Sequence, residues 1–195
     1  MKKSMSVKIE GVKTILFHAF KEEVLDKNKA KSGTAGNNPN EWKTTVIMDE
    51  RRRLYLPSSY LFAPIREAGK YTKIGRGTIS KHIASTLEIS PDIIFLEGLS
   101  VPEEWDKEAP PRDPSLPVYL DARSVVNPMT KGRNMRYRVA CHPGWKCSFQ
   151  VGWDDTVLSF DTMEKILKDA GVMCGTGCGR AIGFGRWKVL EIKKL

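Results

Sequence analysis

Six glycines, from Gly171 to Gly185, fall within fifteen residues in the last part of the sequence. Glycine at this density costs backbone entropy on folding, but it allows backbone N–H groups to approach a ligand closely. Arg180 and Arg186 lie in the same stretch, and Lys188 follows it. Backbone N–H groups beside cationic side chains can hold phosphate groups. The alternative is structural: one glycine ends a helix, and the others form a tight turn that packs against it.

A second group of cations lies in the segment 131–138, which reads KGRNMRYR. Basic side chains beside an aromatic ring suit single-stranded nucleic acid, because cations contact phosphates and rings stack on bases. We therefore expect a binding surface made by Lys131, Arg133, Arg136, Arg138 and Tyr137.

The net charge of +9 is unevenly distributed along the chain. The segment 51–81 has eight Lys or Arg residues and one acidic residue. The segment 122–153 has six Lys or Arg residues and no acidic residue. The segment 82–116 has eight acids and only two basic residues. This segregation favours a polyanion-binding face over a uniformly solvated surface. No apolar run has the length of a membrane span, and no signal-peptide pattern is present, so we expect a cytoplasmic protein without a membrane partner.

The four cysteines are the candidates for a metal site: Cys141, Cys147, Cys174 and Cys178. Their C-x5-C and C-x3-C spacings differ from those of common zinc sites, so we expect buried thiols and neither metal nor other cofactor. The glycine-rich stretch also superficially resembles a G-x-G-x-x-G dinucleotide motif. It follows a predicted helix and precedes a predicted strand, which is the reverse of the required order, and we exclude that function.

Hydrophobic periodicity predicts the elements that position these residues. We expect a first strand over 7–20 bent at Gly11, and hairpins over 43–57 and 136–153 that turn near 49–52 and 142–144. Helical patterns are predicted over 58–69 and within 78–90, and the apolar side of the second is formed by Ile79, His82, Ile83 and Leu87. A third helix over 160–171 has capping-box spacing at Asp161 and Glu164, and a last strand runs over 186–192.

Without its middle block, the chain has the order strand, helix, strand, strand, helix, strand. This is the α+β ferredoxin-like (RRM-like) βαββαβ core. We expect one domain over 1–195, with a long loop or thumb at about 21–45 and an inserted subdomain at about 70–130. Trp145 and Trp153 lie on the apolar phase of their strand and are expected in the core. Trp42 and Trp105, in polar surroundings, are candidates for base stacking or subunit contacts.

The segment 54–66 reads LYLPSSYLFAPIR, and the segment 174–189 reads CGTGCGRAIGFGRWKV. The first resembles the P-G-S-S-L-K-G-x-L-R motif of the RAMP superfamily, the RNA-binding backbone subunits of CRISPR effector complexes. Matching positions are Pro57, Ser59, Leu61, Ile65 and Arg66. The second segment is similar to the glycine-rich loop and G-F-G-R strand that close a RAMP domain.

The resemblance implies a non-catalytic subunit of a CRISPR-type ribonucleoprotein that coats guide RNA through backbone contacts. Its partners would be RNA or another single-stranded nucleic acid, copies of itself and other effector subunits. Relatives that cut target RNA use an Asp on the loop before the Pro-Ser motif, and the segment 29–41 contains no Asp. With the cations above, the candidate RNA-binding residues are Ser58, Ser59, Arg66, Lys131, Arg133, Arg136, Arg138, Gly175, Gly177, Arg180, Gly183 and Arg186.

Other function classes stay open. A guide-processing endoribonuclease of the same fold would be metal-independent and would use a histidine as general base on the RNA 2′-hydroxyl. The available histidines are His18, His82 and His142. A phage-encoded relative that binds single strands is a second alternative. A scaffold protein that binds metal through its cysteines, and no nucleic acid, is a third.

Overall fold

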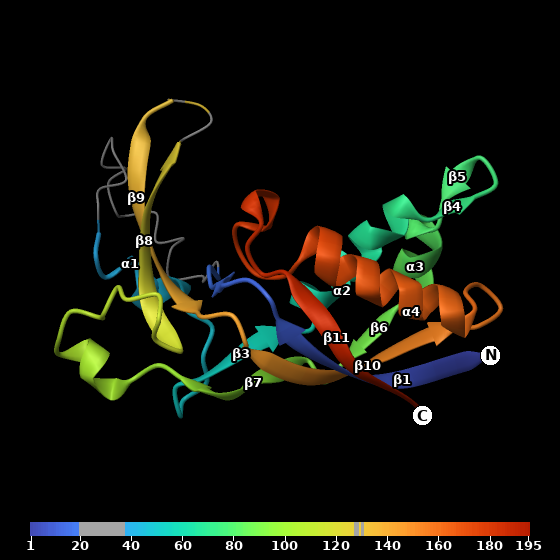
Figure 1. Cartoon of the computed structure of the whole chain (residues 1–195), viewed down its shortest axis with the longest axis horizontal. Coiled ribbons are helices and arrows are strands. Elements are labelled where there is room, and N and C mark those ends of the chain that lie inside the picture. Colours follow the sequence, from blue (N-terminus) through green and yellow to red (C-terminus); the bar gives the residue numbers. More distant parts are fainter. Residues whose placement is uncertain (20–37, 127–128, 130) are drawn as a thin grey trace, which may run out of the picture.

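A four-stranded antiparallel sheet forms the base of the molecule, with strand order β11-β1-β10-β6 (Figure 1). The computed structural model describes residues 1–19, 38–126, 129 and 131–195. The strands are β1 (Lys2–Gly11), β6 (Glu88–Ser90), β10 (Lys146–Asp154) and β11 (Trp187–Lys194). Helices α2 (Ser59–Ala68) and α4 (Phe160–Asp169) lie above this sheet. The chain order β1-α2-β6-β10-α4-β11 is the expected ferredoxin-like βαββαβ arrangement.

The core lies between this sheet and the two helices. Alternate residues of β1 and β10 point to the helices, as the two-residue period of a strand requires. They meet the apolar stripes of α2 and α4, which include Leu61, Ile65, Ile166 and Leu167. The expected burial of Trp145 and Trp153 is confirmed.

A second, three-stranded sheet has the order β2-β9-β8 and projects away from the base. Its strands are β2 (Ile15–Leu16), β8 (Val118–Val126) and β9 (Arg133–Cys141). β8 and β9 pair over their full length, and we call these two strands the arm. Residues 12–14 separate β1 from β2, so the first predicted strand is divided just after Gly11.

The remaining elements are short. β3 (Arg53–Pro57) pairs with β7 (Ile93–Ser100), and β4 (Lys73–Ile74) pairs with β5 (Gly77–Thr78). The short helices are α1 (Glu41–Thr45) and α3 (Ser80–Thr86). In the described part of the chain, 3-10 turns occur at η2 (Gly69–Tyr71), η3 (Glu103–Asp106) and η5 (Arg180–Ile182), and a π-helical turn at η4 (Ala170–Cys174).

The predicted hairpin over 136–153 is wrong. Its two halves enter different sheets, because β9 pairs with β8 and β2, whereas β10 pairs with β1 and β6. The second strand of the core is therefore β6, a three-residue strand within the block that was expected to be inserted. The boundaries of that insertion, at about 70–130, and the single-domain organisation stay predictions.

Three local expectations also need correction. Residues 41–45 form α1, so the expected 43–57 hairpin keeps only its turn and a bridge between Met48 and Leu54. The N-cap of α4 is Ser159, whose hydroxyl accepts the N–H of Thr162 at 3.2 Å. The helix does not stop at Gly171 but continues through the π-helical turn.

Trp42 and Trp105 are not available for base stacking. Both are buried, with exposed fractions of 1% and 4%, and their rings meet edge to face at 5.5 Å. His82 is exposed rather than on the apolar side of α3. Most of the predicted thumb, residues 20–37, lies outside the described residues. None of the described helices is long and apolar enough to cross a bilayer.

Candidate nucleic-acid interface

The glycine-rich stretch forms a loop, residues 175–185, that follows the π-helical turn and lies along α2. We call it the glycine loop. The Thr176 hydroxyl donates a hydrogen bond to the backbone oxygen of Tyr60 at 2.6 Å. The Arg180 guanidinium pairs with the Glu67 carboxylate at 3.0 Å. The loop is therefore attached to both ends of α2, and Arg180 lies beside Glu67.

Packing accounts for most glycines of the loop. All five have positive φ values, between 66° and 92°, which favour glycine. A Cβ on Gly175 would lie 2.8 Å from the backbone oxygen of Gly185, and one on Gly177 would lie 2.8 Å from that of Leu16. Gly183 differs, because no described residue other than its two chain neighbours lies within 4 Å of the position of its absent Cβ.

Two predicted phosphate donors are already used within the loop. The N–H of Gly175 donates to the oxygen of Ala170, and that of Gly183 donates to the oxygen of Arg180. The expectation that these two N–H groups are free for phosphate is wrong. A ligand at Gly183 would instead approach the open surface that the missing side chain leaves.

One face of the arm carries most of its cations. In antiparallel strands, residues directly opposite each other share a face. Arg123 lies opposite Arg136, and Asp121 lies opposite Arg138. The pairing of β2 with β9 extends by a hydrogen bond from Phe17 N–H to Val139 oxygen, which places residue 18 beside Arg138. We call this the cationic face: His18, Asp121, Arg123, Arg136 and Arg138.

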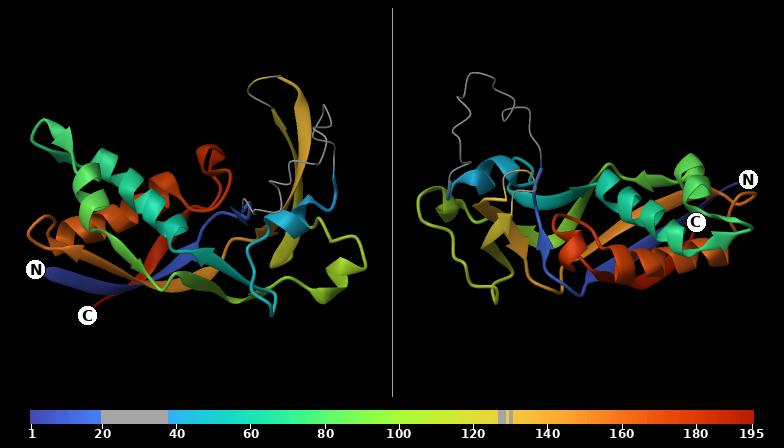
Figure 2. Two further views of the ribbon diagram at one scale, coloured as in Figure 1. Left: turned by 180° about the vertical axis from the view of Figure 1, so that it is seen from behind. Right: turned by 90° about the horizontal axis from the view of Figure 1, so that it is seen from above.

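The cationic face adjoins the glycine loop. Beside it on the same face of the second sheet, Leu16, Tyr119 and Ala140 form a small apolar cluster against Phe184 of the loop. The Arg123 guanidinium lies 4.4 Å from the centre of the Phe184 ring. In two views, the loop rises between the arm and the helices on the same side of the base sheet (Figures 1 and 2). The two cationic segments of the sequence therefore share one surface.

Two carboxylates partly neutralise this surface. Asp121 is buried and pairs with Arg123, and this bond raises the pKa of the Arg123 guanidinium. Glu41 pairs with Arg136 and also accepts the N–H of Tyr137 at 3.0 Å. Arg138 has a buried Nε without a partner among the described residues. Arg138 thus has hydrogen-bonding capacity that its described neighbours do not use.

His18 is half-buried beside these arginines. Burial lowers its pKa, and the charge of Arg138 lowers it further. Its Nδ1 is buried and has no partner among the described residues. The backbone oxygen of His18 accepts the Tyr60 hydroxyl at 3.3 Å, which links this edge of the arm to α2.

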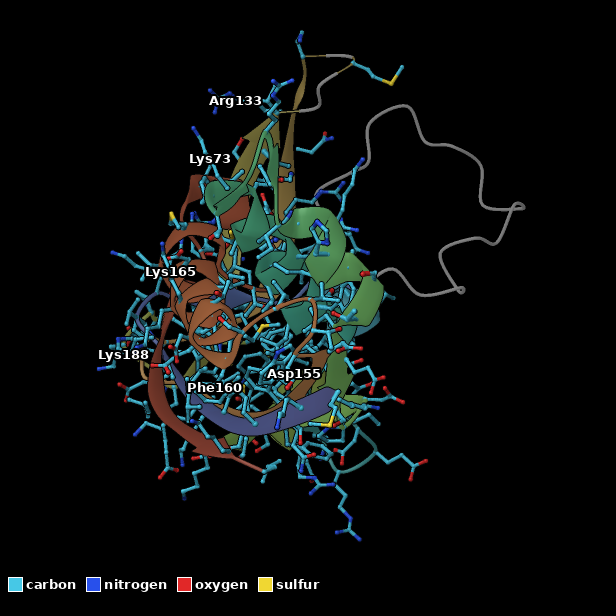
Figure 3. All side chains as sticks on the ribbon, turned by 90° about the vertical axis from the view of Figure 1, so that its right-hand side faces the viewer. Lys73, Arg133, Asp155, Phe160, Lys165 and Lys188 are labelled. Carbon is cyan, nitrogen blue, oxygen red and sulfur yellow. The ribbon has the colours of Figure 1, made fainter. Side chains whose placement is uncertain are left out.

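The other predicted residues are more dispersed. Arg186 has one buried terminal nitrogen without a described partner and lies 3.5 Å from the oxygen of Arg180. Lys131 and Arg133 are exposed towards the free end of the arm, and Figure 3 shows Arg133 on the same upper side as Lys73. Arg66 is exposed on α2.

Some candidates point elsewhere. Ser59 is exposed, and Ser58 approaches Asp92 at 3.4 Å; neither caps α2 through its side chain. Lys188 does not surround the glycines, because it pairs with Glu10 on β1. Tyr137 is only 8% exposed and packs in the core, so its predicted stacking role is wrong.

The cysteines occupy separate positions in the packing. Burial raises the pKa of the Cys147 thiol to about 12 and also raises that of Cys141. Cys174 is buried at the end of η4, and Cys178 packs in the small cluster beside Phe184. Within the described ranges, no group of three or more His, Cys, Asp or Glu side chains is arranged to hold a metal ion.

Reasoning from the sequence did not identify the residues that join the glycine loop to the arm and to α2. Arg123 is a single cation in an apolar strand, and Phe184 and Thr176 fall between glycines. Arg123 and Phe184 act through the contact between the arm and the loop, and Thr176 acts through its hydrogen bond to α2. No local sequence pattern encodes these contacts. The arginine pattern 133–138 was the available signal, since its alternation places Arg136 and Arg138 on one face.

The fold is similar to that of solved Cmr structures, in line with the ferredoxin-like core expected from the sequence. Similar solved structures include a chain of the type III-B Cmr-beta bound to cognate target RNA, with a TM-score of 0.56 and 10% identity. The similarity covers 100% of this chain and 61% of that chain. Cmr6 from Pyrococcus furiosus has a TM-score of 0.52 and 11% identity, with 97% of this chain and 98% of that chain covered. No protein-family model matches, and no curated protein matches.

Proposed function

We propose that this chain is a non-catalytic RNA-binding subunit of a CRISPR-type ribonucleoprotein effector. Single-stranded RNA would lie across the glycine loop and the cationic face of the arm. The observation that carries the proposal is the contact of Arg123 with Phe184, which joins the two cationic segments into one surface. Its partners would be guide RNA, copies of itself and other effector subunits.

The chemistry of this surface supports binding to the RNA backbone rather than reading of bases. Its polar groups are mainly guanidinium groups, which bind phosphate oxygens in two-pronged geometry. Phosphate contacts give affinity without sequence information. That property suits a subunit that coats guides of any sequence. One of the similar structures, the Cmr-beta structure, was solved with cognate target RNA.

Binding of labelled single-stranded RNA by the purified protein tests this proposal. We expect tight binding at low salt that weakens steeply as salt rises, because each phosphate contact releases counterions. Similar affinity for oligonucleotides of different sequence would support coating. Absence of salt-dependent binding to single strands would overturn the proposal. Parallel measurements with single-stranded DNA decide between an RNA subunit and a general single-strand binder, such as a phage-encoded relative.

A guide-processing endoribonuclease is a second candidate, and one observation favours it. His18 lies beside Arg138, and its lowered pKa keeps the imidazole neutral at neutral pH, as a general base must be. Labelled RNA incubated without metal would then yield products ending in a cyclic phosphate. Loss of RNA cleavage in His18→Ala, with cleavage kept in His82→Ala, would support the endoribonuclease. RNA that stays intact with the wild-type protein would exclude it.

A further inference from the structure

A hollow of about 550 Å³ opens at the base of the arm, between η3 and the first residue of β8. Its apolar lining includes Leu99, Trp105, Leu116 and Val118, together with three prolines. Pockets that bind ligands typically have volumes of about 300–1,000 Å³ and are lined mainly by apolar side chains. The hollow therefore has the size and the lining of a binding pocket.

This hollow lies apart from the surface proposed for RNA. Val118 is an odd number of residues from Asp121 and Arg123, so it belongs to the opposite face of the second sheet from the cationic face. In Figures 1 and 2, the yellow-green turn η3 lies on the far side of the arm from the glycine loop. A ligand in the hollow would not compete with RNA on the cationic face.

Hydrogen bonds hold both walls of the hollow in place. On one side, the Arg52 guanidinium donates to the backbone oxygen of Pro102 at 2.9 Å and pairs with the Asp106 carboxylate at 2.7 Å. On the other side, the N–H of Leu120 donates to the backbone oxygen of Pro111 at 2.8 Å. The hollow is thus formed before a ligand arrives, which lowers the free-energy cost of binding.

Two carboxylates lie at the rim of the hollow. Glu104 and Glu108 line it, are exposed, and form no salt bridge with any residue that the structure describes. The N–H of Glu108 donates to the backbone oxygen of Glu104 at 2.8 Å, so the two residues are one helical turn apart and share a side. Lys107 lies between them in sequence but does not line the hollow. The rim is therefore acidic, in a protein whose net charge is +9.

A second, smaller hollow of about 210 Å³ shares Leu99 and Pro117 with the first. A ligand that fills both must be extended, which favours a peptide over a compact small molecule. Protein interfaces combine an apolar centre with a polar rim, and opposite charges face each other across them. Glu97, in the smaller hollow, is already paired with Lys8 at 2.9 Å, so the free negative charge is that of Glu104 and Glu108.

We propose that the hollow between η3 and β8 is a docking site for an extended, basic peptide segment of a partner protein. An apolar side chain of that segment enters the hollow, and its Lys or Arg side chains lie beside Glu104 and Glu108. This interaction is additional to RNA binding and does not depend on it.

Fluorescence anisotropy with labelled synthetic peptides of about eight residues tests the docking site on the full-length protein, since such a peptide can span both hollows when extended. Three peptides are compared, in which leucine alternates with lysine, leucine with glutamate, and glycine with lysine. We expect saturable binding of the lysine–leucine peptide alone. Absence of that binding, or equal binding of either other peptide, would overturn the proposal.

Substitutions at the rim and in the hollow locate the binding. Glu104→Gln combined with Glu108→Gln should weaken binding of the lysine–leucine peptide by about three- to tenfold, because two exposed ion pairs are lost. Glu50→Gln combined with Glu103→Gln is the matched control, since it removes the same charge at exposed positions outside the hollow. Ala109→Trp should fill the hollow and weaken binding without a change of charge. Equal losses in the two double variants, or full binding by Ala109→Trp, would overturn the proposal.

Sedimentation of the wild-type protein and of Ala109→Trp examines a second copy of the chain as the occupant. Self-association of the wild type that is lost in Ala109→Trp would assign the hollow to a second copy and overturn the partner peptide. RNA affinity should be the same in the wild type and in the Glu104, Glu108 double variant. Peptide binding and RNA binding can therefore fail separately, and a loss of RNA affinity in that variant would contradict the separation of the two surfaces.

Discussion

The guanidinium of Arg123, on β8, lies over the ring of Phe184, in the glycine loop, with 4.4 Å between the guanidinium carbon and the ring centre. This contact links the arm to the loop, so that Arg136 and Arg138 of β9 share a surface with the loop that carries Arg180. A second pair of the same kind, Arg53 over Phe95 at 4.1 Å, joins β3 to β7 outside this surface.

Phe184→Ala should weaken RNA binding more than Phe95→Ala. Both substitutions remove a ring under a guanidinium, and each should lower the free energy of unfolding by roughly 2 kcal/mol from lost apolar burial. Of the two rings, only that of Phe184 joins the arm to the glycine loop. Urea unfolding and RNA-binding titrations of the two variants measure both effects. Equal losses of affinity would show that the contact does not organise the binding surface.

Gly185→Ala should be far more damaging to the fold than Gly183→Ala. A Cβ on Gly185 would lie 1.7 Å from the backbone oxygen of Thr176, so the loop would have to open. A Cβ on Gly183 meets nothing, and only its φ of 92° opposes alanine, at a cost of about 1–3 kcal/mol. Thermal or urea unfolding compares the two. Similar stabilities would contradict the loop packing described above.

Arg138→Gln should reduce the salt dependence of RNA binding. If Arg138 contacts one phosphate, the slope of log affinity against log salt should fall by about 0.7, the value for one contact on a single strand. Lys188→Gln removes a cation that pairs with Glu10 on β1, and serves as the control. An unchanged slope with Arg138→Gln, or an equal change with Lys188→Gln, would place the RNA elsewhere.

The stability of the protein should fall as the pH drops below about 6.5, in part because of His18. Burial and then Arg138 lower the pKa of His18 in the folded state, so the unfolded chain binds the proton more readily. The contribution of His18 to the free energy of unfolding is therefore complete above the pKa that His18 has in the unfolded chain. It is lost as the pH falls towards the lower pKa of His18 in the folded state. Urea midpoints between about pH 5 and 8 should show less change in His18→Gln, with exposed His82→Gln as the control. An identical pH dependence of the urea midpoint in the wild type and in His18→Gln would contradict this role of His18 in stability.

Local patterns in the sequence predicted α2, α4 and β11, because apolar residues recur at the helical period in α2 and α4 and β-branched residues fill β11, but the exact ends of these elements were not predicted. They did not predict β6, since three residues are too few to show a period. They also paired β9 with β10, because a glycine turn between two strands usually makes a hairpin. Here β1 and β8 compete for those edges and form the longer pairings.

The candidate site was predicted in part. Arg136, Arg138 and the glycine loop do lie on one surface, but Tyr137, Trp42 and Trp105 are buried rather than available to a ligand. Aromatic residues in polar sequence surroundings can still be buried when distant segments cover them, as Trp105 covers Trp42. The glycines were expected to face a ligand, and most of them face their own loop instead.

Photo-crosslinking tests the central claim most directly. A single strand of RNA with 4-thiouridine at spaced positions is bound to the protein, and the complex is irradiated. The crosslinked peptides are then identified by mass spectrometry. We predict crosslinks from the same RNA to the segments 134–138 and 180–186. Crosslinks confined to the acidic segment 97–116 or to β11, or a signal at only one of the two predicted segments, would contradict the account.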